Sequence, residues 1–311
     1  MRVLVTGADG FVGRHLVQQL LAAGDEVAAA CRPGGVPVDW GGRVEVLPLE
    51  LTDDASVTRT VGWGAEAIVH LAAVASVREA RRDPGAAWEV NAAGTARLCA
   101  AAATGQGRDA AGPVLLLVST GEVYGIGPAA PRVETDPLLP VSSYAASKVG
   151  AEAAALETWR RTGLRVLVAR PFAHTGVGQA DAYVVPAFAR RLREARASGA
   201  ASVPTGNLAP VRDLLDVRDV ATAYRALLER GEPGQTYNIA RGEGVSLAEL
   251  FARLATLTGT AAEPRLDPAL VRGADIPHLV GDSTKLRRAT GWAPTIPLEQ
   301  TLRELVDAQA D

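Results

Sequence analysis

Short apolar segments alternate with longer helical segments through the first half of the 311-residue sequence, and this alternation constrains the fold most. Segments of this kind, rich in Val, Leu and Ile, are typical of strands that are buried on both faces of a parallel sheet. We predict strands at residues 3–6, 26–31, 44–47, 67–71, 114–119 and 165–169. The Ala-rich segments between them are predicted to be helices, of which the first spans residues 14–23 and ends at Gly24.

The pattern predicts an α/β fold in which a doubly wound, parallel Rossmann sheet forms the larger domain. The alternation ends after Pro171. We therefore assign residues 1–171 to the Rossmann domain, with residues 211–241 returning to it through a strand at residues 236–239. Residues 172–210 and 242–311 are predicted to form a smaller C-terminal α/β domain.

Charge and composition exclude several classes of function. The formal net charge is −3 and Lys and Arg form no long run, so neither nucleic acid nor an anionic membrane is an expected partner. No apolar stretch approaches the ~20 residues that span a bilayer. Two distant cysteines, Cys31 and Cys99, and an N-terminus that starts with a strand lead us to expect a reduced, cytoplasmic protein without a signal peptide. The four histidines show no ligand spacing, so no metal is expected.

A glycine-rich loop joins the first predicted strand to the first predicted helix. Its glycines have the spacing G-x-x-G-x-x-G, which lets a backbone turn tightly and approach a pyrophosphate closely. The N-terminus of the following helix adds free N–H groups and a partial positive charge. We predict a dinucleotide site here, although an ordinary glycine-rich turn remains an alternative. The predicted contacts are Gly7, Asp9, Gly10, Phe11, Val12 and Gly13.

The end of the second predicted strand bears on the choice of dinucleotide. A carboxylate at this position would bind the ribose 2′-hydroxyl of NAD, but the sequence has Cys31 and Arg32 there. An arginine suits the 2′-phosphate of NADP. We therefore expect NADP(H) to be preferred, while NAD(H) remains possible if Arg32 is only a solvated loop residue.

Tyr144 and Lys148 are four residues apart in a predicted helix and so share one face. A tyrosine has an ordinary pKa near ~10, and a neighbouring ammonium should lower it. Such a pair can exchange a proton with a substrate oxygen while a hydride moves to or from nicotinamide. Thr120, with Ser119 beside it, follows a buried strand at the predicted carboxyl edge of the sheet. We predict that Thr120 donates a hydrogen bond to the same oxygen, so the catalytic candidates are Thr120, Tyr144 and Lys148.

At these residues the chain resembles the extended short-chain dehydrogenases/reductases, the NAD-dependent epimerase/dehydratase family of nucleotide-sugar enzymes. The resemblance covers essentially the whole chain and includes His70-Leu71-Ala72-Ala73. It implies a C-terminal domain that binds a nucleotide sugar, and commonly a homodimer. It also implies cofactor contacts from Glu50, Leu51, Leu71, Ala72, Ala73, Asn91, Ser119 and Pro171, in addition to Tyr144 and Lys148.

Within the family, the sequence is most similar to the reductases of GDP-4-keto-6-deoxy-mannose. The similarity lies in residues 170–176, 206–208, 212–213, 272–277, 281–287, 290–292 and 296–301. It implies that Arg212 and Arg272 clamp the diphosphate, because a guanidinium forks onto phosphate oxygens. It further implies substrate contacts from Thr120, Glu122, Tyr144, His174 and Asp275.

Two positions depart from this pattern: Ala173 stands where relatives usually have Asn, and Gly273 stands where they usually have Pro. The first change removes a polar contact to the diphosphate, which puts the identity of the sugar nucleotide in doubt.

The reaction can be narrowed by one further position. Dehydratases of the family have an Asp-Glu pair after the Thr, whereas this chain has Gly121-Glu122, which disfavours elimination of water. We expect NAD(P)H-dependent reduction of the C4 ketone of a nucleotide-activated 4-keto-6-deoxy-hexose, GDP-linked in the first instance. A nucleotide-sugar 4-epimerase with tightly bound NAD is the alternative. The second alternative is a non-catalytic Rossmann protein that senses the cofactor, but such a protein would not need the intact Thr120, Tyr144 and Lys148.

Overall fold

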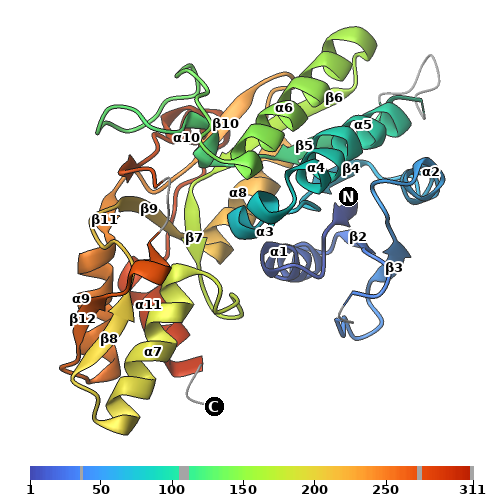
Figure 1. The fold of residues 1–311 in the computed structure, drawn as a ribbon. Coiled ribbons are helices and arrows are strands. Elements are labelled where there is room, and N and C mark those ends of the chain that lie inside the picture. Colours follow the sequence, from blue (N-terminus) through green and yellow to red (C-terminus); the bar gives the residue numbers. More distant parts are fainter. Residues whose placement is uncertain (36–37, 105–111, 272–274, 309–311) are drawn as a thin grey trace.

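The largest sheet consists of parallel strands in the order β10-β6-β5-β4-β1-β2-β3 (Figure 1). The computed structural model describes residues 1–35, 38–104, 112–271 and 275–308. Within them the sheet contains β1 (Arg2–Thr6), β2 (Glu26–Cys31), β3 (Glu45–Pro48), β4 (Ala67–His70), β5 (Val114–Val118), β6 (Arg165–Pro171) and β10 (Thr236–Ile239). All its strand pairings are parallel. The predicted doubly wound Rossmann sheet is therefore confirmed.

Element ends differ from the predicted ones by a few residues, for reasons of pairing and capping. Strand β6 continues to Pro171 because β10 pairs alongside it up to that residue. Helix α1 (Phe11–Ala22) begins three residues before the predicted start, since Arg14 N–H already donates to the carbonyl of Gly10, 3.0 Å away. The end of the glycine loop is thus already the first turn of the helix.

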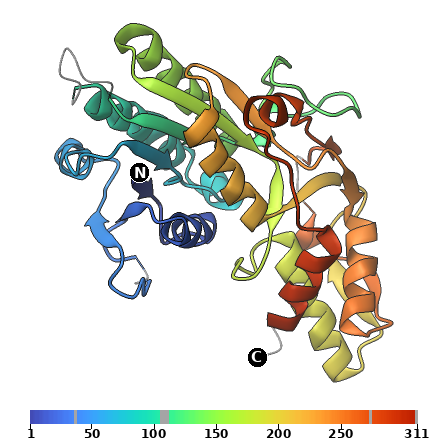
Figure 2. The same ribbon diagram turned by 180° about the vertical axis from the view of Figure 1, so that it is seen from behind.

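Helices cover both faces of the main sheet (Figures 1 and 2). One face packs against α1, α8 (Val217–Arg230) and α10 (Thr284–Thr290). The other face packs against α2 (Asp54–Val61), α5 (Gly94–Thr104) and α6 (Ser143–Thr162). Outside α6 lie α3 (Val77–Arg82), α4 (Pro84–Trp88) and the π-helical turn η1 (Glu89–Ala93). Apart from the edge strand β3, most of whose residues are exposed, the strands are buried on both sides, which accounts for their largely apolar sequences.

Smaller sheets form beside the carboxyl edge of the main sheet. Strand β9 (Val211–Asp216) pairs with β7 (Ala173–Thr175), β11 (Gly244–Ser246) and β13 (His278–Leu279). Strand β8 (Ser202–Thr205) pairs with β12 (Glu263–Leu266). A separate apolar core joins these strands to α7 (Val184–Ser198), α9 (Leu247–Thr258) and α11 (Leu298–Ala308). Short 3₁₀ turns, η2 (Gly121–Tyr124) and η3 (Pro268–Leu270), complete the described elements.

The predicted boundaries between the two domains differ from this arrangement in two places. Strand β9 belongs to the smaller sheet, because its edges pair with β7, β11 and β13, so the return to the main sheet begins with α8. Near the C-terminus, α10 packs on α8, and Trp292 Nε1 donates to the carbonyl of Asp219 at 3.1 Å. Residues 284–292 therefore pack with the larger unit, and the division into cofactor and substrate domains stays a prediction.

In the part of the chain that the structure describes, we find no helix with the length and apolarity that crossing a membrane requires.

A buried ion pair ties α6 to the carboxyl edge of the main sheet. The carboxylate of Glu152 on α6 accepts two hydrogen bonds from Arg170 on β6, from Nε at 3.0 Å and from Nη2 at 2.7 Å. It also accepts a hydrogen bond from the hydroxyl of Ser119, which follows β5. Both charged side chains are almost fully buried, with 4% and 6% of their surface exposed. Each buried charge is therefore stabilised by the other in place of water.

Removing one partner should be costly. Glu152→Ala leaves the guanidinium of Arg170 buried without its carboxylate, and we expect it to lower the free energy of unfolding by about 3–5 kcal/mol. Urea unfolding at neutral pH measures the change. Glu157→Ala is the matched control, because Glu157 pairs with Arg161 on the exposed face of the same helix. The control should unfold like the wild type, and equal midpoints for the two variants would contradict this view of Glu152.

Candidate active site

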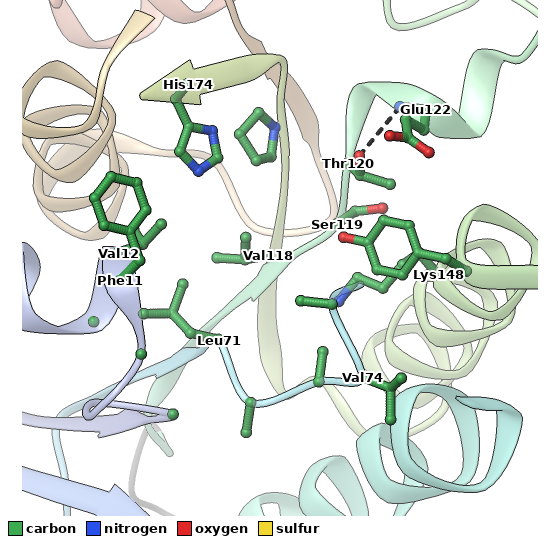
Figure 3. Close-up of a pocket in the computed structure, with 18 of the residues that line it drawn as sticks. Phe11, Val12, Leu71, Val74, Val118, Ser119, Thr120, Glu122, Lys148 and His174 are labelled. Carbon is green, nitrogen blue, oxygen red and sulfur yellow. Dashed lines mark hydrogen bonds between the residues drawn. The ribbon is translucent and has the colours of Figure 1, made fainter. Parts of the chain in front are cut away.

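A cavity of about 810 Å³ lies along the carboxyl edge of the main sheet and extends to the smaller sheet. It opens between β1 and β4, where the chain changes its direction of progress across the sheet. Open α/β sheets bind their ligands at such a switch point. Figure 3 shows Ser119, Thr120 and Lys148 on one side of the cavity and Phe11, Val12 and His174 on the other.

The glycine loop forms the wall of the cavity at the end of β1. Gly7 has a positive φ of 69°, and a Cβ there would lie 2.8 Å from the backbone nitrogen of Ala72. A Cβ on Gly13 would lie 2.4 Å from the carbonyl oxygen of Gly7. Only glycine fits at either position, so the loop can pack against Ala72 and turn directly into α1, whose first residues line the cavity. This cradle fits the pyrophosphate of a dinucleotide.

The three catalytic candidates meet at the other side of the cavity. Thr120 caps the turn η2, and its Oγ1 accepts a hydrogen bond from the backbone N–H of Glu122 at 3.2 Å. Helix α6 starts at a Ser142 cap and presents Tyr144 and Lys148 one turn apart. All three side chains line the cavity. The structure therefore brings the three candidates to one cavity, and their catalytic roles stay a prediction.

The protonation of the pair differs from the sequence-based expectation. Burial raises the pKa of Tyr144, the charges of Glu122 and Tyr183 raise it further, and the hydrogen bond with Thr120 lowers it only in part. Burial also lowers the pKa of Lys148 to about 8, while the charge of Glu152 raises it. The expected lowering of the Tyr144 pKa by Lys148 is thus not found in this structure: desolvation of the phenol is the largest influence, and the ammonium is not among the groups that shift this pKa.

Most of the other predicted site residues also line this cavity. From the cofactor prediction these are Gly7, Asp9, Gly10, Phe11, Val12, Gly13, Arg32, Glu50, Leu51, Leu71, Ala72, Ala73, Ser119 and Pro171. From the substrate prediction they are Glu122, His174 and Arg212. These residues lie at the edge of the main sheet and on β7 and β9 of the smaller sheet. The sequence alone did not show that the two sheets share one cavity.

Asn91 and Asp275 do not line the cavity, and Arg272 lies outside the described residues, as does Gly273. The amide of Asn91 is buried, where its Oδ1 accepts from Val74 N–H at 2.8 Å and its Nδ2 donates to Ser147 Oγ at 2.9 Å. It therefore positions the cavity-lining Val74 against α6. Asp275 lies behind Arg212, with its Oδ1 2.7 Å from Arg212 Nη2.

Arg212 and His174 bring the smaller sheet into the cavity wall. Arg212 on β9 donates from Nη1 to the carbonyl oxygen of Ile276 at 2.7 Å, in addition to its ion pair with Asp275. His174 on β7 stacks on Phe11 of α1, with the rings 7° from parallel. Burial lowers the pKa of His174, so its ring is neutral at physiological pH. The cavity thus has a single guanidinium from the smaller sheet among the described residues that line it.

Sequence reasoning missed several lining residues with polar side chains, among them Glu79, Tyr183 and Tyr224. Tyr183 precedes α7; burial raises its pKa, and the charges of Glu122 and Glu79 raise it further. Tyr224 is fully buried on α8, and within the described chain its hydroxyl has no hydrogen-bond partner. No motif marks these residues, although two tyrosines are unusual in so aromatic-poor a sequence. Among the residues that the structure describes, no cluster of His, Cys, Asp or Glu could hold a metal ion.

Comparison with known proteins agrees with this geometry. Residues 3–240 match the NAD dependent epimerase/dehydratase family. GDP-6-deoxy-D-mannose reductase of Pseudomonas aeruginosa is 36% identical, over 98% of this chain and 96% of its own length.

Two solved structures are similar over nearly their full length. RMD from Pseudomonas aeruginosa, complexed with NADPH, has a TM-score of 0.83 and 33% identity, with 99% of this chain and 98% of that chain covered. UDP-glucose 4-epimerase from Thermus thermophilus, in complex with NAD, has a TM-score of 0.87 and 33% identity over the same shares. The chain therefore belongs to the NAD dependent epimerase/dehydratase family and is an NAD(P)-dependent oxidoreductase of the extended short-chain dehydrogenase/reductase group.

Proposed function

We propose that the chain reduces the C4 ketone of a nucleotide-activated 4-keto-6-deoxy-hexose, with NADPH as the reductant. One observation carries the proposal: Thr120, Tyr144 and Lys148 line the same cavity as the glycine cradle. The reaction needs a proton donor and a hydrogen-bond donor in the site that binds nicotinamide, and this arrangement supports both roles.

The chain's own residues have distinct parts in this reaction. Reduced nicotinamide, when bound, supplies a hydride to C4. Tyr144 donates its phenolic proton to the carbonyl oxygen as that oxygen becomes an alkoxide; its raised pKa keeps it protonated at neutral pH, as a donor must be. Thr120 Oγ1 accepts from Glu122 N–H, so its own hydroxyl proton can point to the carbonyl oxygen. The ammonium of Lys148 would hold the nicotinamide ribose hydroxyls.

The substrate class is inferred from the charge of the cavity and from the relatives. Arg212 is a guanidinium at the side of the cavity formed by the smaller sheet, where it suits a diphosphate. The 36% identical relative is a reductase of a GDP-linked 6-deoxy sugar, which supports a GDP-linked substrate. Ala173 lines the same cavity, so the methyl group there leaves room and removes a polar contact at the sugar nucleotide. A homodimer remains a prediction.

A 4-epimerase is the second candidate. The solved epimerase with NAD and the solved RMD with NADPH are each 33% identical to this chain. Bound NAD would accept the hydride from C4 while Tyr144 takes the proton of the C4 hydroxyl, and both would then return to C4 and its oxygen from the opposite face of the sugar. The two candidates differ in whether the dinucleotide is released. An epimerase would be purified with NAD bound and would convert its substrate without net oxidation of added NADPH.

Tyr144→Phe tests the reaction directly. We expect the wild type to oxidise NADPH with a 4-keto-6-deoxy sugar nucleotide from a panel of GDP-, dTDP- and UDP-linked compounds, and the product to be two hydrogen atoms heavier by mass spectrometry. The variant lacks the proton donor and should lose about 10²–10⁴ in rate with an unchanged unfolding midpoint. Tyr237→Phe, outside the cavity lining, serves as the matched control. Near-normal turnover by Tyr144→Phe would show that the catalytic assignment is wrong.

Binding of NADPH should depend on the charge of Lys148. Because burial lowers the pKa of Lys148 to about 8, the side chain loses its proton as the pH rises through that value. The dissociation constant of NADPH, measured by fluorescence titration, should therefore rise above this pH and stay level below it. Lys148→Met should bind more weakly with no such pH dependence. A wild-type constant that is level throughout, or a Lys148→Met variant with the same profile as the wild type, would refute the role.

A further inference from the structure

The acidic residue missing from the end of β2 has a substitute in the glycine loop. Cys31 and Arg32 follow β2 in sequence, but the carboxylate of Asp9 reaches this place from the loop after β1. A Cβ on Gly35 would lie 2.8 Å from Asp9 Oδ2, so the carboxylate lies against the backbone of the segment after β2. Burial and then the charge of Asp9 raise the pKa of the Cys31 thiol to about 11, which agrees with this position.

Asp9 and Arg32 therefore bring opposite charges to one end of the cavity. Both line it, together with Ala30, Leu49 and Glu50 of the adjoining strand ends. No ion pair within 4.0 Å joins Asp9 to Arg32, nor to any other cation in the described ranges, so the carboxylate is not neutralised by a direct partner. Arg14 Nε donates to the backbone carbonyl of Asp9 at 2.8 Å, which holds the loop in this shape.

The position of this end of the cavity identifies what it would bind. The glycine cradle lies between it and the catalytic side chains, and a dinucleotide whose pyrophosphate lies on the cradle extends its adenosine toward β2. The ribose hydroxyls then meet Asp9. A carboxylate accepts a hydrogen bond from a 2′-hydroxyl, but it repels a 2′-phosphate.

We propose that Asp9 is a specificity-determining residue for the cofactor, which favours NADH and opposes the preference for NADPH that Arg32 confers. The proposal rests on the proposed function only in requiring that this cavity bind a nicotinamide dinucleotide. The two charges act against each other, so the NADPH and NADH dissociation constants of the wild type differ by less than Arg32 alone would cause. The proposed role of Asp9 also depends on Gly35, because a side chain at this position would displace the Asp9 carboxylate.

Direct titration of the purified chain with NADPH and with NADH tests the assignment. The variants are Asp9→Asn, which removes the charge at nearly constant volume, and Arg32→Gln, which removes the opposing charge. Asp307→Asn is the matched control, since Asp307 is exposed on α11 and does not line the cavity. Thermal unfolding midpoints of all variants establish that they are folded.

We expect Asp9→Asn to raise the ratio of the NADH to the NADPH dissociation constant by about tenfold, and Arg32→Gln to lower it by a similar factor. Asp307→Asn should leave the ratio within about twofold of the wild type, as expected for a distant exposed charge. The effect of Asp9→Asn should shrink in concentrated salt, because it acts through a partly exposed charge. A ratio for folded Asp9→Asn that matches the control would overturn the proposal.

Failure of the proposed function gives a different result. A chain that binds both dinucleotides but reduces no 4-keto sugar contradicts the reductase, and its two dissociation constants still decide the role of Asp9. A chain that binds neither dinucleotide overturns both.

Discussion

The candidate active site depends on the attachment of one helix to one edge of the main sheet. Tyr144, Lys148 and Glu152 recur at intervals of four residues along α6 and so lie on the same face. Glu152 is the buried end of this row, bound to Arg170 of β6 and to Ser119, which follows β5. The first two residues of the row, which line the cavity, are thereby held next to Thr120.

The buried network extends beyond this pair and explains why the edge of the sheet can carry so much charge. Arg170 also donates to the hydroxyl of Tyr124 at 2.9 Å, and that hydroxyl donates to Asn238 on β10 at 2.7 Å. Each polar atom in this chain of contacts thus has a partner, as buried groups require. The same burial shifts the protonation of the neighbouring groups: it lowers the pKa of Lys148 and raises that of Tyr144.

The second half of the site comes from the smaller sheet, and Asp213 on β9 connects the two units. Its carboxylate accepts backbone hydrogen bonds from Arg241 and Gly242, which follow β10, at 2.9 and 2.8 Å. A third comes from Gly281, which follows β13, at 3.3 Å. The neighbouring Arg212 is therefore placed in the cavity by contacts that bind β9 to the end of the main sheet. A substrate held by Arg212 and by Tyr144 would bridge two separately built parts of the chain.

Local rules determined much of this from the sequence. Burial on both faces requires continuous apolar strands, so the order of strands and helices in the first half was predictable to within a few residues. The same is true of the glycine loop and of Tyr144 with Lys148, since their chemistry depends on short spacings along the chain. Residues 211–216 were predicted to belong to the Rossmann domain, but they form β9 of the smaller sheet, because pairing partners are chosen in space and those of β9 lie up to 67 residues away, in β13.

Only the tertiary structure decided which side chains meet across such distances. Asn91 has the sequence context of a cofactor contact, yet its amide is used by Val74 and Ser147. Tyr183 and Glu79 belong to no motif, but the fold places both in the cavity wall. Asp9 was predictable as a loop residue, whereas its approach to the end of β2 follows from parallel pairing of β1 with β2. The protonation of Tyr144 likewise depends on burial, which is a property of the packed molecule and of no single segment of its sequence.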